Sequence, residues 1–100
     1  DGRLIVITTH AGNVAQTIQR IVSQATEVIS EELARSLLAS GLKAIVHQKI
    51  MSGRLYYSTL FDTGNACSII RNKSLPFEAI NGEVDAQKIR IKSGVSLDLR

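Results

Sequence analysis

The spacing of apolar residues changes at Gly41, and this change constrains the fold more than any other feature of the sequence. Before Gly41, apolar residues recur every three or four positions, as on one face of a helix. After it they alternate with polar residues, as in a half-buried strand. With 100 residues, 44% of them hydrophobic, the chain is long enough for one domain with a modest core.

Two helices are predicted before Gly41. Asn13 and Ser30 are N-cap residues, and two glutamates follow Ser30 where the helix dipole favours acids. Gly41 ends the second helix. We expect the apolar faces of both helices to pack on a sheet. These faces consist of Val14, Ile18, Ile21, Val22 and Ala25 in the first helix and Leu33, Leu37 and Leu38 in the second.

Strands are predicted before the helices and throughout the second half. The predicted strands are residues 3–9, 42–51, 54–62 and 65–72, followed by a hairpin over 86–100 with its turn at Ser93-Gly94. Ser52-Gly53 is the turn of an earlier hairpin. The element order is therefore β-α-α-β-β-β-β-β. This order predicts a single α+β domain, residues 1–100, in which two N-terminal helices cover a mainly antiparallel sheet.

The triplet Asp62-Thr63-Gly64 follows a strand-like run and precedes another apolar stretch. Aspartic peptidases hold a carboxylate in a turn of this composition, in which Thr supplies a hydroxyl and Gly leaves room for a tight backbone. Two such carboxylates share a proton, because like charges about 3 Å apart cannot both ionise. The alternative is a structural role, since the same triplet also ends an ordinary strand in a turn.

A longer segment around the triplet supports the catalytic alternative. Residues 45–76, IVHQKIMSGRLYYSTLFDTGNACSIIRNKSLP, resemble the N-terminal half of a retroviral-type aspartic peptidase. In that family a hairpin leads into Asp-Thr-Gly, and a Ser or Thr and an apolar pair follow, here Ser68-Ile69-Ile70. The resemblance implies that Asp62 is the catalytic aspartate, with Thr63 and Gly64 as its supporting turn. It also implies a peptide substrate, a homo-oligomer in which two copies of Asp62 meet, and a viral or mobile-element origin.

The second interpretation is a small basic α+β binding module without catalytic activity, whose partner is nucleic acid or protein. The formal net charge of +3 permits such a partner. Tyr56 and Tyr57 point to opposite faces of their strand, so at most one of them can stack on a base. A solvated sheet edge would have a similar composition. Five basic residues form a candidate phosphate-binding strip: Arg71, Lys73, Lys88, Arg90 and Lys92.

The remaining polar residues predict no cofactor and no metal. Cys67 is the only cysteine, which excludes an intramolecular disulfide and is typical of a reducing compartment such as the cytoplasm. Cys67, His10 and His47 lack the close spacing of zinc ligands. We expect His10 at the entry to the first helix and His47 on the solvated side of a strand. No stretch approaches the ~18 apolar residues of a membrane span, so no membrane is expected as a partner.

Overall fold

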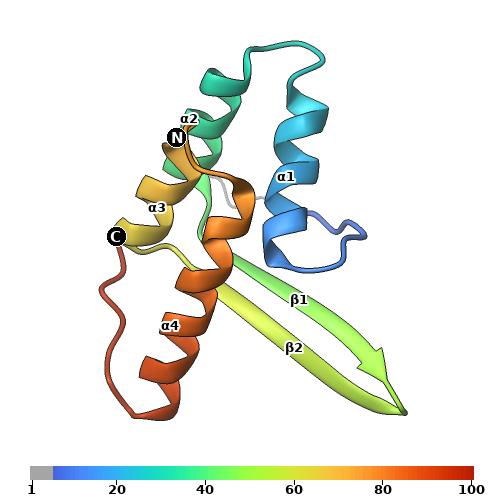
Figure 1. Cartoon of the computed structure of the whole chain (residues 1–100), viewed down its shortest axis with the longest axis vertical. Coiled ribbons are helices and arrows are strands. Elements are labelled where there is room, and N and C mark those ends of the chain that lie inside the picture. Colours follow the sequence, from blue (N-terminus) through green and yellow to red (C-terminus); the bar gives the residue numbers. More distant parts are fainter. Residues whose placement is uncertain (1–5) are drawn as a thin grey trace.

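Four helices and a two-stranded hairpin make up the computed structural model, which describes residues 6–100 (Figure 1). The helices pack against one another, and the hairpin projects from them so that its turn lies far from the helical body (Figure 1). In chain order the elements are α1 (Val14–Ala25), α2 (Glu31–Gly41), β1 (Ala44–Met51), β2 (Arg54–Phe61), α3 (Gly64–Arg71), the 3-10 turn η1 (Phe77–Ala79) and α4 (Ile80–Lys92). None of the helices in this part of the chain is long and apolar enough to cross a membrane.

The two N-terminal helices are confirmed, together with their N-caps. Gly41 is the last residue of α2, and the C-cap is Leu42 rather than Gly41. The Asn13 side chain accepts a hydrogen bond from the Gln16 amide at 2.9 Å, and the Ser30 hydroxyl accepts one from the Leu33 amide at 3.1 Å. Each cap satisfies an amide that has no partner inside the helix. The sequence therefore fixes where α1 and α2 begin.

The first predicted hairpin is also confirmed. β1 and β2 are antiparallel, with Ile45 opposite Leu60 and Ile50 opposite Leu55. Ser52 and Gly53 join them with φ angles of +52° and +76°, which is the left-handed pair that a type I′ turn requires. This turn matches the right-handed twist of the strands it connects, so the hairpin is set by local sequence.

The predicted five-stranded second half is wrong: residues 6–100 contain one two-stranded sheet, and the order is α-α-β-β-α-α. Residues 65–72 belong to helix α3 and its C-cap, and residues 86–92 belong to α4. Of the strand predicted over residues 3–9, residues 6–9 are irregular, and the remainder lies outside the described residues.

The misassigned hairpin over 86–100 is a helix followed by its terminating motif. Gly94 has a φ of +72°, and the Val95 amide donates to the Arg90 carbonyl at 2.9 Å. This is the Schellman arrangement, in which a left-handed glycine lets the chain turn back over the last helical carbonyls. Ser93-Gly94 is therefore a helix end. The alternation of Ile89 and Ile91 with basic residues does not mark a buried face, because these isoleucines are 66% and 49% exposed.

The core lies between the helices, and the sheet contributes only its base. Ile45 and Leu60 are the buried residues of the hairpin. Ile18 and Val22 of α1 are buried as expected. The predicted face of α2 is wrong at Leu33 and Leu37, which point to solvent, whereas the predicted Leu38 is partly buried against the core. The buried side chains of α2 are instead Ala34, Arg35 and Ala39.

Arg35 explains why α2 turns this face inward. Its guanidinium donates to the carbonyls of Asn72 at 2.7 Å and Leu75 at 3.3 Å, just beyond the C-terminus of α3. It also pairs with Glu31 at 3.1 Å and lies 4.0 Å from the centre of the Phe77 ring. Arg35 is only 3% exposed. Such a buried cation requires these partners, so it determines which side of α2 faces the core.

Truncating Arg35 should therefore destabilise the protein strongly. We expect Arg35→Ala to lower the free energy of unfolding by about 3–5 kcal/mol, because buried carbonyls and Glu31 lose their donor. Arg71→Ala is the matched control: Arg71 is exposed and bonds only to Ser40, so its loss should cost less than about 1 kcal/mol. Urea unfolding followed by circular dichroism measures both. Equal effects would contradict the role given to Arg35.

The corrected face of α2 gives a second stability prediction. Ile18→Ala should cost about 2–5 kcal/mol because Ile18 is 1% exposed and leaves a cavity. Leu37→Ala should change stability by no more than about 0.5 kcal/mol, because Leu37 is 58% exposed. A large loss at Leu37, measured by denaturant midpoint, would show that α2 faces the other way.

Candidate functional site

Asp62 lies where β2 passes into α3, and its carboxylate is held by two cations. Arg100 Nε donates to Asp62 Oδ1 at 3.0 Å, and Lys43 Nζ lies 3.9 Å from Oδ2. The backbone amide of Arg100 also donates to the Asp62 carbonyl at 2.9 Å. Asp62 is 8% exposed. The hydrogen bond to this carboxylate raises the pKa of the Arg100 guanidinium.

Thr63 and Gly64 form the start of α3. The Thr63 hydroxyl accepts from the Ala66 amide at 3.1 Å as the N-cap, and it donates to Glu83 Oε2 at 2.8 Å. A Cβ built on Gly64 would meet nothing within 4 Å, so this position does not require glycine for space. Thr63 therefore has the contacts of a helix cap that also ties α3 to α4.

Gln87 of α4 completes the junction. Its amide oxygen accepts from the Phe61 amide at 2.9 Å, and its amide nitrogen donates to the Phe61 carbonyl at 3.1 Å. The same nitrogen donates to Glu83 at 2.9 Å. With 1% exposure, Gln87 supplies the end of β2 with the two hydrogen bonds that a neighbouring strand would otherwise provide.

These contacts bear on the peptidase interpretation without testing it. In that interpretation Asp62 shares a proton with a second carboxylate, whereas here Asp62 faces a guanidinium. The triplet also leads into a helix. The catalytic roles of Asp62, Thr63 and Gly64 stay predictions, and the contacts of Asp62 and Thr63 are those of structural residues. Among residues 6–100, no three His, Cys, Asp or Glu side chains gather as metal ligands would.

The five residues of the predicted basic strip do not share one face, because Lys88, Arg90 and Lys92 lie in helix α4 and not in a strand. Lys88 and Lys92 are one turn apart on α4, whereas Arg90 lies between them on another side and donates to the Ser96 carbonyl at 2.7 Å. Arg71 ends α3 and donates to the Ser40 hydroxyl at 2.9 Å. Lys73 lies in the loop after α3. Their role in binding stays a prediction, but a strand no longer aligns them.

A different basic surface emerges from the hairpin and α1. Residues 6–26 and 42–61 contain Arg20, Lys43, Lys49 and Arg54 but no Asp or Glu. Asp1 aside, every acidic residue of the chain lies in 27–41 or 62–100. The charges are thus separated along the sequence, with four cations and no carboxylate in one part and both signs mixed in the other. Lys43 is the exception in space, because it lies 3.9 Å from Asp62 Oδ2.

The cations of the hairpin lie on one of its two faces. Residues opposite each other in the register share a face, so Lys49 lies beside Tyr56, Arg54 beside Met51 and His47 beside Ser58. These six residues, 47, 49, 51, 54, 56 and 58, are called the basic face. At the base of the hairpin the same side carries the buried Ile45 and Leu60, so the basic face continues from the side that packs on the helices.

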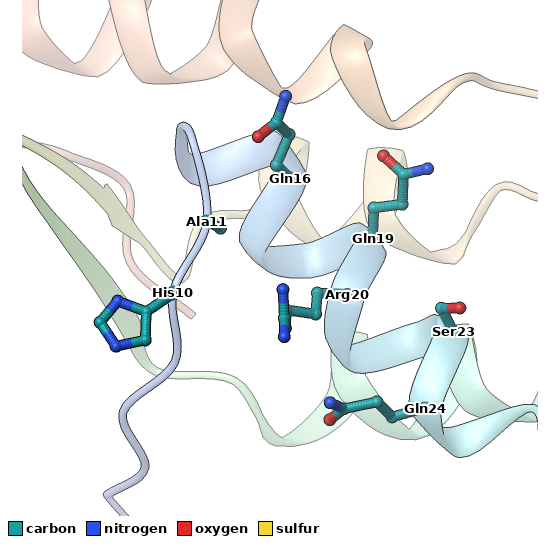
Figure 2. A pocket seen from close by; sticks show the side chains of 7 residues that line it. All are labelled: His10, Ala11, Gln16, Gln19, Arg20, Ser23 and Gln24. Atoms are coloured by element: carbon teal, nitrogen blue, oxygen red, sulfur yellow. The ribbon is translucent and has the colours of Figure 1, made fainter.

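The basic face adjoins a polar groove along α1. His47 Nε2 lies 2.8 Å from the Ala11 carbonyl, which can only accept, so this nitrogen carries the proton. Ala11 is one wall of the groove, whose volume is about 470 Å³. Figure 2 shows the Arg20 guanidinium and the Gln24 amide pointing from α1 toward the segment that carries His10. The groove is lined by His10, Ala11, Gln16, Gln19, Arg20, Ser23 and Gln24, with no carboxylate among them.

Comparison with known proteins finds no match to the chain among protein-family models, curated proteins or solved structures. Inference about function therefore depends on the geometry of the chain itself. Sequence reasoning missed the basic face because it selected segments in which lysine and arginine are closely spaced, and Lys49 and Arg54 are not. The signal that could have found it is the absence of acids from two long segments, which is visible in the sequence.

The ion pair of Asp62 allows the structural and catalytic interpretations to be separated by stability. Asp62→Asn should lower the free energy of unfolding by about 1–2 kcal/mol, because it removes the charge from a bond to the part-exposed Arg100. Asp98→Asn, at an exposed position, is the control and should change little. Thermal and urea unfolding measure both. Unchanged or raised stability in Asp62→Asn would favour catalysis, because catalytic groups often reduce stability.

Proposed function

We propose that this domain is a non-catalytic nucleic-acid-binding module, and that the basic face and the α1 groove form its binding surface. The observation that carries the proposal is the absence of carboxylates from both segments that build this surface. A phosphate backbone is a dense line of negative charge, and a surface with cations and no acids attracts it along its whole length. The mixed charges of α4, where Glu83 and Asp85 accompany Lys88 and Lys92, offer no such surface.

The shape of the hairpin supports a nucleic acid rather than a small anion. Eight residues in each strand give a ribbon of roughly 25 Å at about 3.3 Å per residue. The major groove of duplex DNA admits a two-stranded ribbon of this kind. Lys49 and Arg54 lie near the free end of the ribbon, and Arg20 lines the groove along α1. A bound strand can therefore meet cations at both ends of the surface.

Tyr56 supports a contact with bases in addition to phosphates. It is 46% exposed and lies on the basic face directly opposite Lys49. An aromatic ring beside a cation is a common platform for an unpaired base, because the ring stacks on the base while the cation meets its phosphate. Tyr57, on the other face, does not share this surface.

Removing the two cations near the ribbon end should weaken binding in a salt-dependent way. We expect the double variant Lys49→Gln/Arg54→Gln to reduce the slope of log affinity against log salt by about 1.4–1.8, since each of the two lost phosphate contacts contributes about 0.7–0.9. Fluorescence anisotropy with labelled single-stranded and duplex oligonucleotides of mixed sequence, at several salt concentrations, measures this slope.

The matched control is Lys88→Gln/Lys92→Gln, which removes the same charge from α4 and should leave the slope nearly unchanged. Equal reductions in both double variants would show that only net charge matters, and would remove the basic face as the binding surface. An absence of binding by the parent protein at low salt would overturn the proposed function. A larger loss with single strands than with duplex in Tyr56→Ala would identify base stacking.

A further inference from the structure

The second face of the hairpin is apolar and exposed. Successive pairs of opposing residues in the hairpin lie on alternate faces. The side opposite the basic face therefore carries Val46, Gln48, Ile50, Leu55, Tyr57 and Thr59. These six residues are called the apolar face. Val46 and Leu55 are each 59% exposed, Ile50 is 75% exposed and Tyr57 is 69% exposed. No residue of this face is charged.

The size of this face is that of a surface patch that often has a binding role. Its four large side chains expose on the order of 400 Å² of apolar surface, within the roughly 300–600 Å² of the largest patch on a typical monomer. A two-stranded hairpin is marginally stable in water without a third layer or strand. Within residues 6–100, only the base of this hairpin packs on the helices.

We infer that the apolar face binds the apolar face of a second copy of this chain, so that two hairpins stack face to face around a two-fold axis. The inference does not depend on nucleic-acid binding, because it uses the opposite side of the ribbon. Charge selects this face: Lys49 and Arg54 would repel their counterparts if two basic faces met, whereas two apolar faces carry no charge to repel.

The order of side chains along the ribbon fits a two-fold axis that passes through the pair Gln48 and Tyr57, the middle pair of the apolar face. With the ribbons antiparallel, Gln48 meets the partner's Gln48, and each amide can donate to the other. Ile50 then meets the partner's Val46, and Leu55 meets the partner's Thr59. The polar side chain at the centre is thereby satisfied, and the apolar side chains are covered.

The base of the ribbon extends the contact beyond these pairs. Phe61 belongs to the same alternating set as Leu55 and Tyr57. It lines a shallow, mainly apolar hollow with Ile91, Leu97 and Leu99. In the antiparallel arrangement the turn of one ribbon lies above this base in the other copy. Adding this area brings the contact toward the ~800 Å² per partner of a standard stable interface.

Cysteine cross-linking tests the face and the axis together. Both proteins carry Cys67→Ala, so that only the introduced cysteine can react. Gln48→Cys, on the axis, should form an intermolecular disulfide under mild oxidation. Ser58→Cys, on the opposite face of the adjacent strand, should form little intermolecular disulfide although its apolar face is intact. Equal cross-linking of the two variants, or none in Gln48→Cys, overturns the arrangement.

Sedimentation at several protein concentrations tests the association itself. Leu55→Glu should weaken dimerisation by more than about tenfold, because the interface would bury unpaired charges. Tyr56→Glu, the next residue on the other face, should leave dimerisation unchanged. Circular dichroism of both variants, read beside the sedimentation, shows that the fold is retained. A parent protein that is monomeric at all concentrations, or a dimer indifferent to Leu55→Glu, overturns the inference.

Discussion

The bidentate hydrogen bonding of Gln87 to the end of β2 is the interaction on which the rest of the structure depends. Through it, a side chain of α4 takes the place of a third strand. The two-stranded sheet can therefore end inside the helical core with the Phe61 amide and carbonyl both hydrogen-bonded. Thr63 and Glu83 continue the same network. Because each member satisfies another, the network fixes the direction in which the hairpin leaves the helices.

The direction of the hairpin gives its two sides different surroundings. One side begins at the buried Ile45 and Leu60, passes the contact between His47 and Ala11, and continues into carboxylate-free surface. The other side begins at Phe61 and stays uncharged and largely apolar toward the turn. A single ribbon thus presents two chemically distinct surfaces, one with cations and no carboxylate and one uncharged and largely apolar. Strand alternation separates them without any additional element.

The sequence predicted those elements whose signals are local, and failed where tertiary contacts decide. Asn13, Ser30 and the Ser52-Gly53 turn each act within a few residues, and α1, α2 and the hairpin were predicted correctly. Residues 65–72 form a short apolar stretch and residues 88–92 alternate, and segments this short suit either a helix or a strand. Thr63 and Gly94 act as helix ends there, but both residue types also occur in turns between strands. The face of α2 depends on Arg35 meeting carbonyls near Asn72, which no local pattern encodes. For the candidate site, the sequence identified Asp62 but not its partner Arg100, 38 positions away.

The separation in sequence between the hairpin and the residues that hold it affects the order of folding during synthesis. The hairpin closes across a two-residue turn, and isolated hairpins form in roughly 1–10 μs. Its anchors, Gln87 and Arg100, leave the ribosome later, at about 5–20 residues per second. For seconds, therefore, a nascent chain presents α1, α2 and the hairpin without α4, and the apolar side of the hairpin is uncovered. On a polysome, where neighbouring nascent chains are identical, that interval allows two ribbons to meet before either domain is complete.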